Sequence, residues 1–239
     1  MSIDFSGKVV LVAGGTGGLG RAVSLAFLER GANVAVTWIH EAEFQALQKS
    51  AASHAAQLAG FHTNVTDPRQ AQDLVSQILS RWNRLDVLVN TVGGYAVGIP
   101  LWDLQPDVFE HMLDLNLRAG YALAHAAAPP MIARKSGAIV NVAAKAAWDH
   151  AAGASAYAAS KAAAVALIDS LAADLLGTGV RANSILPSII DTEANRKAMP
   201  NADFTKWPKP EDIAKVVLFL ASDDARVVHG ASVSVFGNA

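Results

Sequence analysis

Apolar positions along the chain alternate between short continuous runs and longer stretches with helical spacing. The runs predict strands at 8–13, 33–37, 58–62, 86–89, 138–142, 180–186 and 232–236, and the spaced stretches predict helices at 21–30, 41–53, 68–82, 107–134, 155–176 and 211–221. Continuous apolar strands are typical of a parallel sheet that is covered on both faces. The pattern therefore predicts an α/β fold, a single-domain Rossmann-type doubly wound parallel sheet of about seven strands with helices on both faces. No linker or repeat interrupts residues 1–239, so we expect one domain.

The first predicted strand runs directly into the glycine-rich segment Gly14-Gly15-Thr16-Gly17-Gly18-Leu19-Gly20. Glycines allow a backbone to approach a ligand closely, and the helix that follows offers free N–H groups to a pyrophosphate. Because the segment lies between a first strand and a first helix, it indicates dinucleotide binding. A bare structural turn is the alternative interpretation.

Tyr157 and Lys161 are four residues apart in a predicted helix, so their side chains lie on one face. A free tyrosine ionises near ~10, and a fixed cation nearby lowers that pKa toward the working pH. The pair therefore suits proton transfer. Taken alone, the spacing is also common for a half-buried tyrosine and a surface lysine.

Composition excludes several classes of function. The net charge of −2 and the lack of a Lys/Arg cluster argue against a nucleic-acid partner, and zero cysteines exclude disulfide and thiolate chemistry. Lys161, Asp169 and Asp174 interrupt the alanine-rich run near 151–176, so it is not expected to span a membrane. We expect a cytoplasmic protein that binds a small-molecule substrate, with no metal site and no membrane partner.

In such a sheet, ligands bind beyond the carboxyl ends of the strands, and the residues there resemble those of a known family. Gly14, Gly18 and Gly20 match the G-x-x-x-G-x-G of the short-chain dehydrogenase/reductase family, and 90–93 (Asn-Thr-Val-Gly) stand where it has N-N-A-G. Asn116, Tyr157 and Lys161 occupy its catalytic positions. The resemblance covers essentially the whole chain.

The resemblance implies roles for individual residues. Lys161 would bind the nicotinamide ribose and lower the pKa of Tyr157, Tyr157 would exchange a proton with the substrate, and Asn116 would hold a water between Lys161 and solvent. The implied cofactor-binding residues are Gly14, Thr16, Gly18, Leu19, Gly20, Trp38, His40, Asn64, Val65, Asn90, Gly93, Tyr157, Lys161, Pro187, Ile190 and Thr192. Asn64 and Val65 would face the adenine, and Ile190 and Thr192 the carboxamide. Other interpretations are a satisfied helix-interior amide for Asn116, a strand-end turn for Asn64 and a helix cap for Thr192.

The sequence departs from the family at Ala144. The family has a serine thirteen residues before its tyrosine, and this serine hydrogen-bonds the oxygen of a ketone or alcohol. Loss of one such donor typically raises the barrier by ~3 to 4 kcal/mol. Either the chemistry is lost, or the substrate develops no isolated oxyanion.

Quinonoid dihydropteridine reductases, members of the same family, also have alanine there. Segments 93–98, 144–147 and 191–207 are similar to their G-G-W-A-G-G, A-K-A-A and D-T-x-x-N-R-K-x-M-P-x-A-D-F-x-x-W. A quinonoid pterin takes up a hydride and a proton on a conjugated ring, so it needs no serine. In this interpretation 191–207 form a substrate lid, and Tyr95 stacks on the flat heterocycle. The expected substrate-contacting residues are Tyr95, Ala144, Trp148, Asn195 and Trp207; alternatively, Tyr95 and Trp207 only pack the lid against the body.

The end of the second strand bears on the choice of cofactor. An acidic residue there would bind the adenosine ribose and repel a 2′-phosphate, but Trp38 occupies the position. Neither the glycine loop nor 38–40 carries a lysine or arginine that would bind the phosphate. We expect NADP(H) to be favoured, with NAD(H) possible.

Two alanine-rich helices indicate a mode of assembly. The helices at 107–134 and 155–176 carry many small residues, and the family commonly pairs these helices across a two-fold axis. We expect a homodimer or homotetramer; dense packing within one chain is the alternative.

Three functions remain open at this level. The first is an NAD(P)H-dependent reductase of a quinonoid pterin or similar flat conjugated substrate, with Tyr157 as proton donor. The second is a reductase or dehydrogenase of other carbonyl or alcohol substrates, in which a water or Lys145 replaces the serine. The third is a dinucleotide-binding sensor without turnover, although such a protein would not need the phenol of Tyr157.

Overall fold

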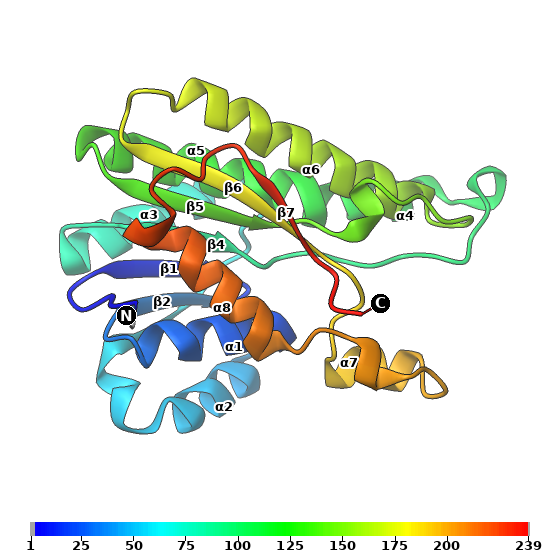
Figure 1. Cartoon of the computed structure of the whole chain (residues 1–239), viewed down its shortest axis with the longest axis horizontal. Helices are drawn as coiled ribbons and strands as arrows, with labels where there is room; N and C mark the ends of the chain where they lie inside the picture. The colour runs from blue at the N-terminus through cyan, green and yellow to red at the C-terminus, as the bar shows by residue number, and fades with distance from the viewer. Residues whose placement is uncertain (1–2, 239) are drawn as a thin grey trace.

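The computed structural model describes residues 3–238 and contains a seven-stranded parallel sheet in the order β3-β2-β1-β4-β5-β6-β7 (Figure 1). The strands are β1 (Val9–Ala13), β2 (Asn33–Trp38), β3 (Leu58–His62), β4 (Val87–Asn90), β5 (Gly137–Val142), β6 (Val180–Pro187) and β7 (Ser232–Val235). Every neighbouring pair is parallel. The predicted fold class and strand number are confirmed.

Helices cover both faces of this sheet. One face carries α1 (Gly18–Leu28), α2 (Glu41–Ala51) and α8 (Pro210–Ala221), and the other carries α3 (Pro68–Trp82), α5 (Ala119–Ala133) and α6 (Ser155–Asp174). Alternate residues of β1 enter the two cores: Val10 and Val12 pack toward α1, whereas Val9 and Leu11 pack toward α3 and α5. The continuous apolar run of β1 is thus explained by burial on both faces.

A helix runs over residues 106–133, in agreement with the helix predicted over 107–134, and contains a π-helical turn. It consists of α4 (Pro106–Leu113), a π-helical turn at Asp114–Arg118 and α5. The wider turn contains Asn116, whose side chain bonds to Gly94 and Ser160 outside the helix. Such turns are frequent at functional sites, and their hydrophobic spacing resembles that of an ordinary helix. The helix predicted over 41–53 ends two residues earlier, at Ala51, because Ala52, at φ 46°, begins a 3₁₀ segment that extends to Gln57.

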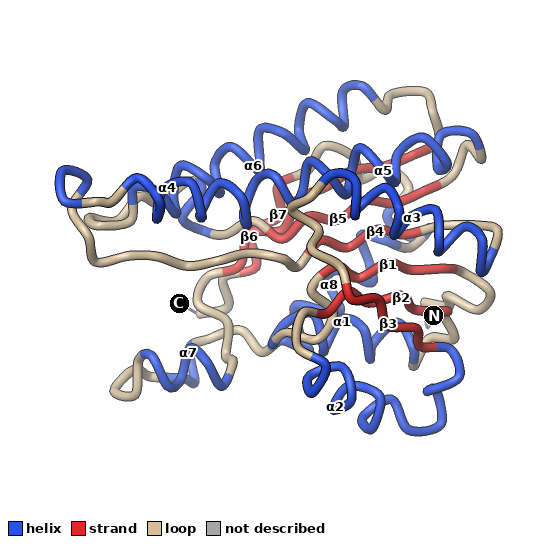
Figure 2. Tube along the Cα trace, turned by 180° about the vertical axis from the view of Figure 1, so that it is seen from behind, coloured by secondary structure: helices blue, strands red, loops and turns tan. Residues whose placement is uncertain are grey.

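The strand order changes direction at β1, which lies between β2 and β4. Ligands of open α/β sheets bind beyond the carboxyl ends of the strands at such a point. The short helix α7 (Glu193–Ala198) and the loop before α4 extend from this same end of the sheet (Figures 1 and 2). The helix α7, within the segment predicted to form a lid, therefore lies at the end of the sheet where a ligand is expected.

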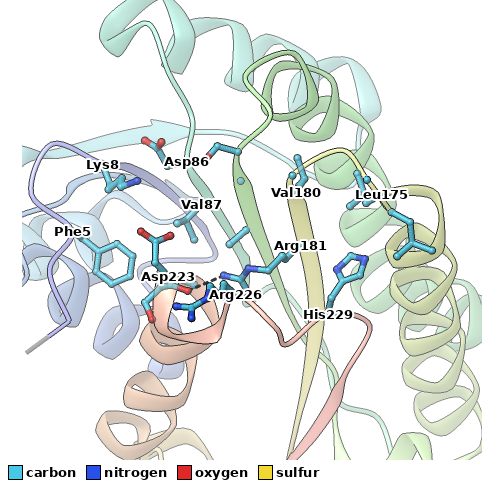
Figure 3. Close-up of a pocket in the computed structure, with 18 of the residues that line it drawn as sticks. Phe5, Lys8, Asp86, Val87, Leu175, Val180, Arg181, Asp223, Arg226 and His229 are labelled. Atoms are coloured by element: carbon cyan, nitrogen blue, oxygen red, sulfur yellow. Dashed lines mark hydrogen bonds between the residues drawn. The ribbon is translucent and has the colours of Figure 1, made fainter. Parts of the chain in front are cut away.

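A second hollow lies at the opposite end of the strands, and Figure 3 shows Arg181 at its centre. The guanidinium of Arg181 donates to the backbone oxygens of Leu220 (2.8 Å), Ser222 (2.9 Å) and Val228 (3.2 Å). Burial lowers the pKa of Arg181. These bonds join β6 to the C-terminal end of α8 and the segment that leads to β7, so this hollow has a structural role.

The helix α6 is long and apolar enough to cross a membrane by length and composition alone. In the fold it packs against β6 and α4, and its residues Val165, Ile168 and Ala172 are buried there. Packing within the domain therefore accounts for part of its apolar character.

Candidate active site

A cavity of about 440 Å³ opens at the carboxyl ends of the strands, between the glycine loop and α7. It brings together residues from well-separated parts of the sequence. They are Leu19, Thr91, Gly93, Gly94, Tyr95, Val142, Ala143, Ala144, Lys145, Ala146, Asp149, Tyr157, Lys161, Pro187, Ser188, Ile189, Ile190, Asn195 and Met199. Tyr157 and Lys161 are thus at the end of the sheet that the topology designates for ligands.

Lys161 is held in the wall of this cavity with only 5% of its surface exposed. Its Nζ donates to the carbonyl oxygen of Val142 at 3.1 Å, and burial lowers the pKa of Lys161 to about 8. An ammonium has three N–H groups, so two remain for a ligand. A Cβ atom on Gly93 would lie 3.0 Å from Nζ, so glycine at this position keeps the space beside the ammonium open.

Tyr157 has a higher pKa than the sequence led us to expect. Burial, together with the neighbouring Tyr95, raises the pKa of Tyr157 to about 12. Loss of hydration is the larger cause, and Lys161 does not offset it. Tyr157 consequently keeps its proton at neutral pH, as a proton donor in a reduction requires.

Asn116 fixes the loop that follows β4. Its Oδ1 accepts from the N–H of Gly94 at 2.9 Å, and its Nδ2 donates to the Gly94 oxygen at 3.2 Å and to Ser160 Oγ at 2.9 Å. Ser160 Oγ in turn donates to the carbonyl oxygen of Tyr157. Protein groups therefore satisfy the Asn116 amide, which fits the alternative interpretation of a satisfied helix-interior amide. The amide does not need the water that the family resemblance implies between Lys161 and solvent. Ser160 was not singled out from the sequence, because a serine between a Tyr and a Lys carries no distinctive pattern.

The glycine loop is fixed by contacts with β2 and the lid. Gly14 adopts φ +72° and donates its N–H to Thr37 Oγ1 at 2.8 Å. A Cβ atom on Gly20 would lie 2.1 Å from the Gly14 oxygen, and one on Gly18 would lie 2.8 Å from Thr192 Cγ2. Side chains at these two positions would collide with the Gly14 backbone and with Thr192. Glycine at both positions keeps the loop tight against the start of α1, where a dinucleotide pyrophosphate can bind.

Thr192 and the strand-end residues have structural bonds of their own. Thr192 accepts a hydrogen bond from the Asn195 N–H and so caps α7, as its alternative interpretation predicts. Asn64 accepts from the N–H and the hydroxyl of Thr66, which fits the alternative of a strand-end turn. Asn90 donates to Asn141 Oδ1 and accepts from the N–H of Val92 in the buried turn after β4.

Residues expected around the adenine differ in their exposure. Val65 belongs to the core, so its backbone alone remains for the adenine. At the end of β2, the Trp38 ring stacks on Phe44, while His40 is exposed immediately before α2.

Of the expected substrate residues, Tyr95, Ala144 and Asn195 line the cavity. The ring of Tyr95, 63% exposed, meets the Tyr157 ring edge to face at a centroid distance of 4.9 Å. Trp148 and Trp207 are not among the lining residues. Trp207 is 7% exposed and packs on Phe204, a contact that fits the alternative interpretation of packing, and its role in substrate contact stays a prediction.

The cavity also contains groups outside the expected cofactor and substrate residues, among them Lys145, which the sequence analysis considered only as a replacement for the serine. Lys145 pairs with Asp149 (3.6 Å), and its ammonium lies 5.3 Å from the Phe236 ring centre. Met199 and Ser188 line the same wall, and Ser188 donates to the Phe236 oxygen. Lys145 and Met199 lie in segments that resemble family motifs, whereas no motif marks Asp149 and Ser188.

Comparison with known proteins agrees with this geometry. The sequence profile of the short chain dehydrogenases matches residues 8–203. The chain belongs to the short-chain dehydrogenase/reductase family. As a member of this family it is an NAD(P)-dependent oxidoreductase.

Relatives of this family match the chain over nearly its full length. The chain is 30% identical to a 3-oxoacyl-acyl-carrier-protein reductase of Thermotoga maritima, with 97% of each chain covered. It is 32% identical to a D-threitol dehydrogenase of Mycolicibacterium smegmatis, covering 99% of this chain and 96% of the other. A solved structure described as ElxO with NADP bound superimposes with a TM-score of 0.91 at 26% identity, over 96% of this chain and 97% of the other.

Proposed function

We propose that this enzyme reduces a flat, conjugated substrate, with quinonoid dihydropterin as the leading candidate, and that Tyr157 donates the proton. The observation that carries the proposal is Ala144, which lies in the cavity wall at the position of the family's serine. The bound reduced nicotinamide would supply the hydride. A conjugated ring spreads the resulting electron density over several atoms, so no single oxygen requires a strong donor.

Other hydroxyls in the cavity wall do not replace the serine, because they are engaged with the backbone. Thr91 Oγ1 donates to the Ala13 oxygen at 2.7 Å, and Ser188 Oγ donates to the Phe236 oxygen at 2.7 Å. The amide of Asn195 donates to the Ile190 oxygen at 2.8 Å. A ketone in this cavity would therefore find both hydroxyls engaged, which leaves Tyr157, the second N–H of Asn195 and the ammonium of Lys145 as donors.

The aromatic pair at the mouth of the cavity supports a flat substrate. The exposed ring of Tyr95 stands nearly perpendicular to Tyr157, at an interplanar angle of 80°. An exposed tyrosine face provides a stacking surface for a heterocycle. Lys145 and Asp149 lie on the same wall and offer one donor and one acceptor to polar ring substituents.

In the proposed reaction, Tyr157 holds and transfers the proton, and Lys161 binds the nicotinamide ribose with its two remaining N–H groups. Asn116 keeps the loop at Gly94 in place beside both residues. The product is the substrate with one added hydride and one added proton.

Reduction of ordinary carbonyls, or oxidation of alcohols, is the second candidate, and the relatives favour it. Their names include a 3-oxoacyl reductase and a polyol dehydrogenase. In this alternative Lys145, which lines the cavity next to Ala144, would contact the substrate oxygen.

Substitution Ala144→Ser separates the two candidates. We expect the variant to gain ketone reduction by about a hundredfold, the effect of one added oxyanion donor, while pterin reduction stays within a few-fold. Broad ketone activity that is present in the parent protein and unchanged by the substitution would instead support the carbonyl candidate.

We also propose that the enzyme is a cytoplasmic homodimer or homotetramer that assembles through the helices predicted at 107–134 and 155–176, which correspond to α4, α5 and α6. Exposed apolar groups lie along this side, including Leu101 and Trp102 (86% exposed), and they border a groove that includes Ala159 and Ala162 of α6. Light scattering on the purified protein tests this assembly, and a monomer at micromolar concentration would contradict it.

A further inference from the structure

A carboxylate from α2 reaches the glycine loop. The hydroxyl of Thr16 donates to Oε2 of Glu43 at 3.0 Å, although the two residues are 27 positions apart. Thr16 belongs to the loop that fits the pyrophosphate, and Glu43 lies in the first turn of α2. This contact places a negative charge beside the adenosine end of the dinucleotide crevice.

The first turn of α2 is fixed by packing as well as by this hydrogen bond. Phe44, next to Glu43, stacks on Trp38 with ring centres 6.0 Å apart and planes within 8°. The Trp38 ring also packs on His62 at 4.7 Å. Trp38 therefore fills the end of β2, where the fold usually carries its ribose-binding acid, and its packing partner Phe44 orients the turn that holds Glu43.

We propose that Glu43 replaces that acid: its carboxylate accepts a hydrogen bond from the 2′-hydroxyl of the adenosine ribose, and Thr16 holds it in position. This inference rests on the dinucleotide-dependent function proposed above. A carboxylate has about four lone-pair sites, and Thr16 uses one, so acceptor capacity remains. The same charge would repel a 2′-phosphate, and the enzyme would prefer NADH to NADPH.

The basic residue nearest the loop in sequence does not oppose this assignment. Arg21 follows the loop, but its guanidinium donates to Ser50 Oγ of α2 at 2.6 Å. The glycine loop and 38–40 contain no lysine or arginine. The earlier expectation of NADPH considered only these segments, whereas Glu43 comes from the following helix.

Binding of two ligands that lack the nicotinamide tests the proposal without turnover. Calorimetric titration would measure the Kd of ADP-ribose and of its 2′-phosphorylated form. Because a hydrogen bond to a charged group is worth about a factor of ten or more in affinity, we expect the parent protein to bind ADP-ribose at least about tenfold more tightly. In Glu43→Gln we expect ADP-ribose to bind about tenfold more weakly and the two affinities to become similar.

Glu41 provides a matched control on the same helical turn. Glu41→Gln removes an equal charge, but Glu41 contacts Gln45 and not Thr16, so the ratio of the two affinities should not change. Thr16→Val should reduce the preference for ADP-ribose, and Thr16→Ser should restore it, because serine retains the hydroxyl. A purely structural role of Thr16 would alter both affinities equally.

Two outcomes would overturn the inference and are distinguishable from failure of the proposed function. Equal effects of Glu43→Gln and Glu41→Gln, or tighter binding of the phosphorylated ligand to the parent protein, would refute the role of Glu43 while leaving dinucleotide binding intact. Absence of binding of either ligand to the parent protein would refute the dinucleotide-dependent function itself.

Discussion

Replacing Lys161 with methionine should stabilise the protein at neutral pH, although it removes a residue of the active site. Burial lowers the pKa of Lys161 from the ordinary 10.5 to about 8, and this difference corresponds to about 3 kcal/mol of unfavourable free energy for the buried ammonium. Loss of the hydrogen bond to the Val142 oxygen offsets about 1–2 kcal/mol of that gain. Lys161→Met should therefore raise the free energy of unfolding by roughly 1–2 kcal/mol, or Tm by about 2–8 °C.

The stability that Lys161→Met gains over the parent protein should decrease as the pH rises above 8. Below pH 8 the ammonium of Lys161 is charged in both folded and unfolded protein, so the folded state carries the full penalty. Between about pH 8 and 10.5 the unfolded protein binds more protons, and the stability of the parent protein rises with pH. The advantage of Lys161→Met should therefore shrink by about 1.4 kcal/mol per pH unit above pH 8 and change sign near pH 9. Above about pH 10.5 only the effect of the lost hydrogen bond remains, and it disfavours the variant.

Urea unfolding of both proteins at pH 7 and pH 10, at one protein concentration, measures this difference. Lys215→Met is the matched control, because Lys215 is 73% exposed and pairs with Asp212 at the surface. Its effect should stay within about 0.5 kcal/mol and show no such window. A destabilised Lys161→Met protein at pH 7, or a stability difference that does not vary with pH, would refute the reasoning.

Two further substitutions test separate parts of the structure. Tyr157→Phe should reduce turnover at least about a hundredfold while the Kd of the dinucleotide changes little, because only the proton donor is removed; retained activity in a steady-state assay would contradict its role. Arg181→Met should lower the free energy of unfolding by about 2–4 kcal/mol in urea, since the carbonyl oxygens of Leu220, Ser222 and Val228 lose their donor. The dinucleotide affinity of this variant should not change, and an unaltered unfolding midpoint would contradict the structural role of these three hydrogen bonds.

The fold could be predicted from the sequence because the inner strands are buried on both faces and helices with regular apolar spacing connect the strands. The run at 9–13 and the proline that opens α3 have local causes, so they are visible in the sequence. The π-helical turn between α4 and α5 could not be predicted in this way. It depends on the bonds of Asn116 to Gly94 and Ser160, which are distant in sequence.

The same distinction applies to the candidate site. Positions of Tyr157 and Lys161 follow from one helical turn and a family motif, but their pKa values depend on tertiary burial, which the spacing does not encode. Trp207 was expected to contact the substrate from its place in a motif, and the motif does not encode its packing on Phe204. The contact between Thr16 and Glu43 joins two elements whose relative placement is set by the sheet.

The most direct test of the proposed function is the rate of NADH and NADPH oxidation by the parent protein with chemically generated quinonoid dihydropterin and with a panel of small ketones. The reduced nicotinamide can be followed by its absorbance. Because Ala144 provides no oxyanion donor, we predict rapid turnover of the pterin and rates at least about a hundredfold lower for the ketones. Efficient ketone reduction without pterin activity would contradict the account and favour the carbonyl candidate.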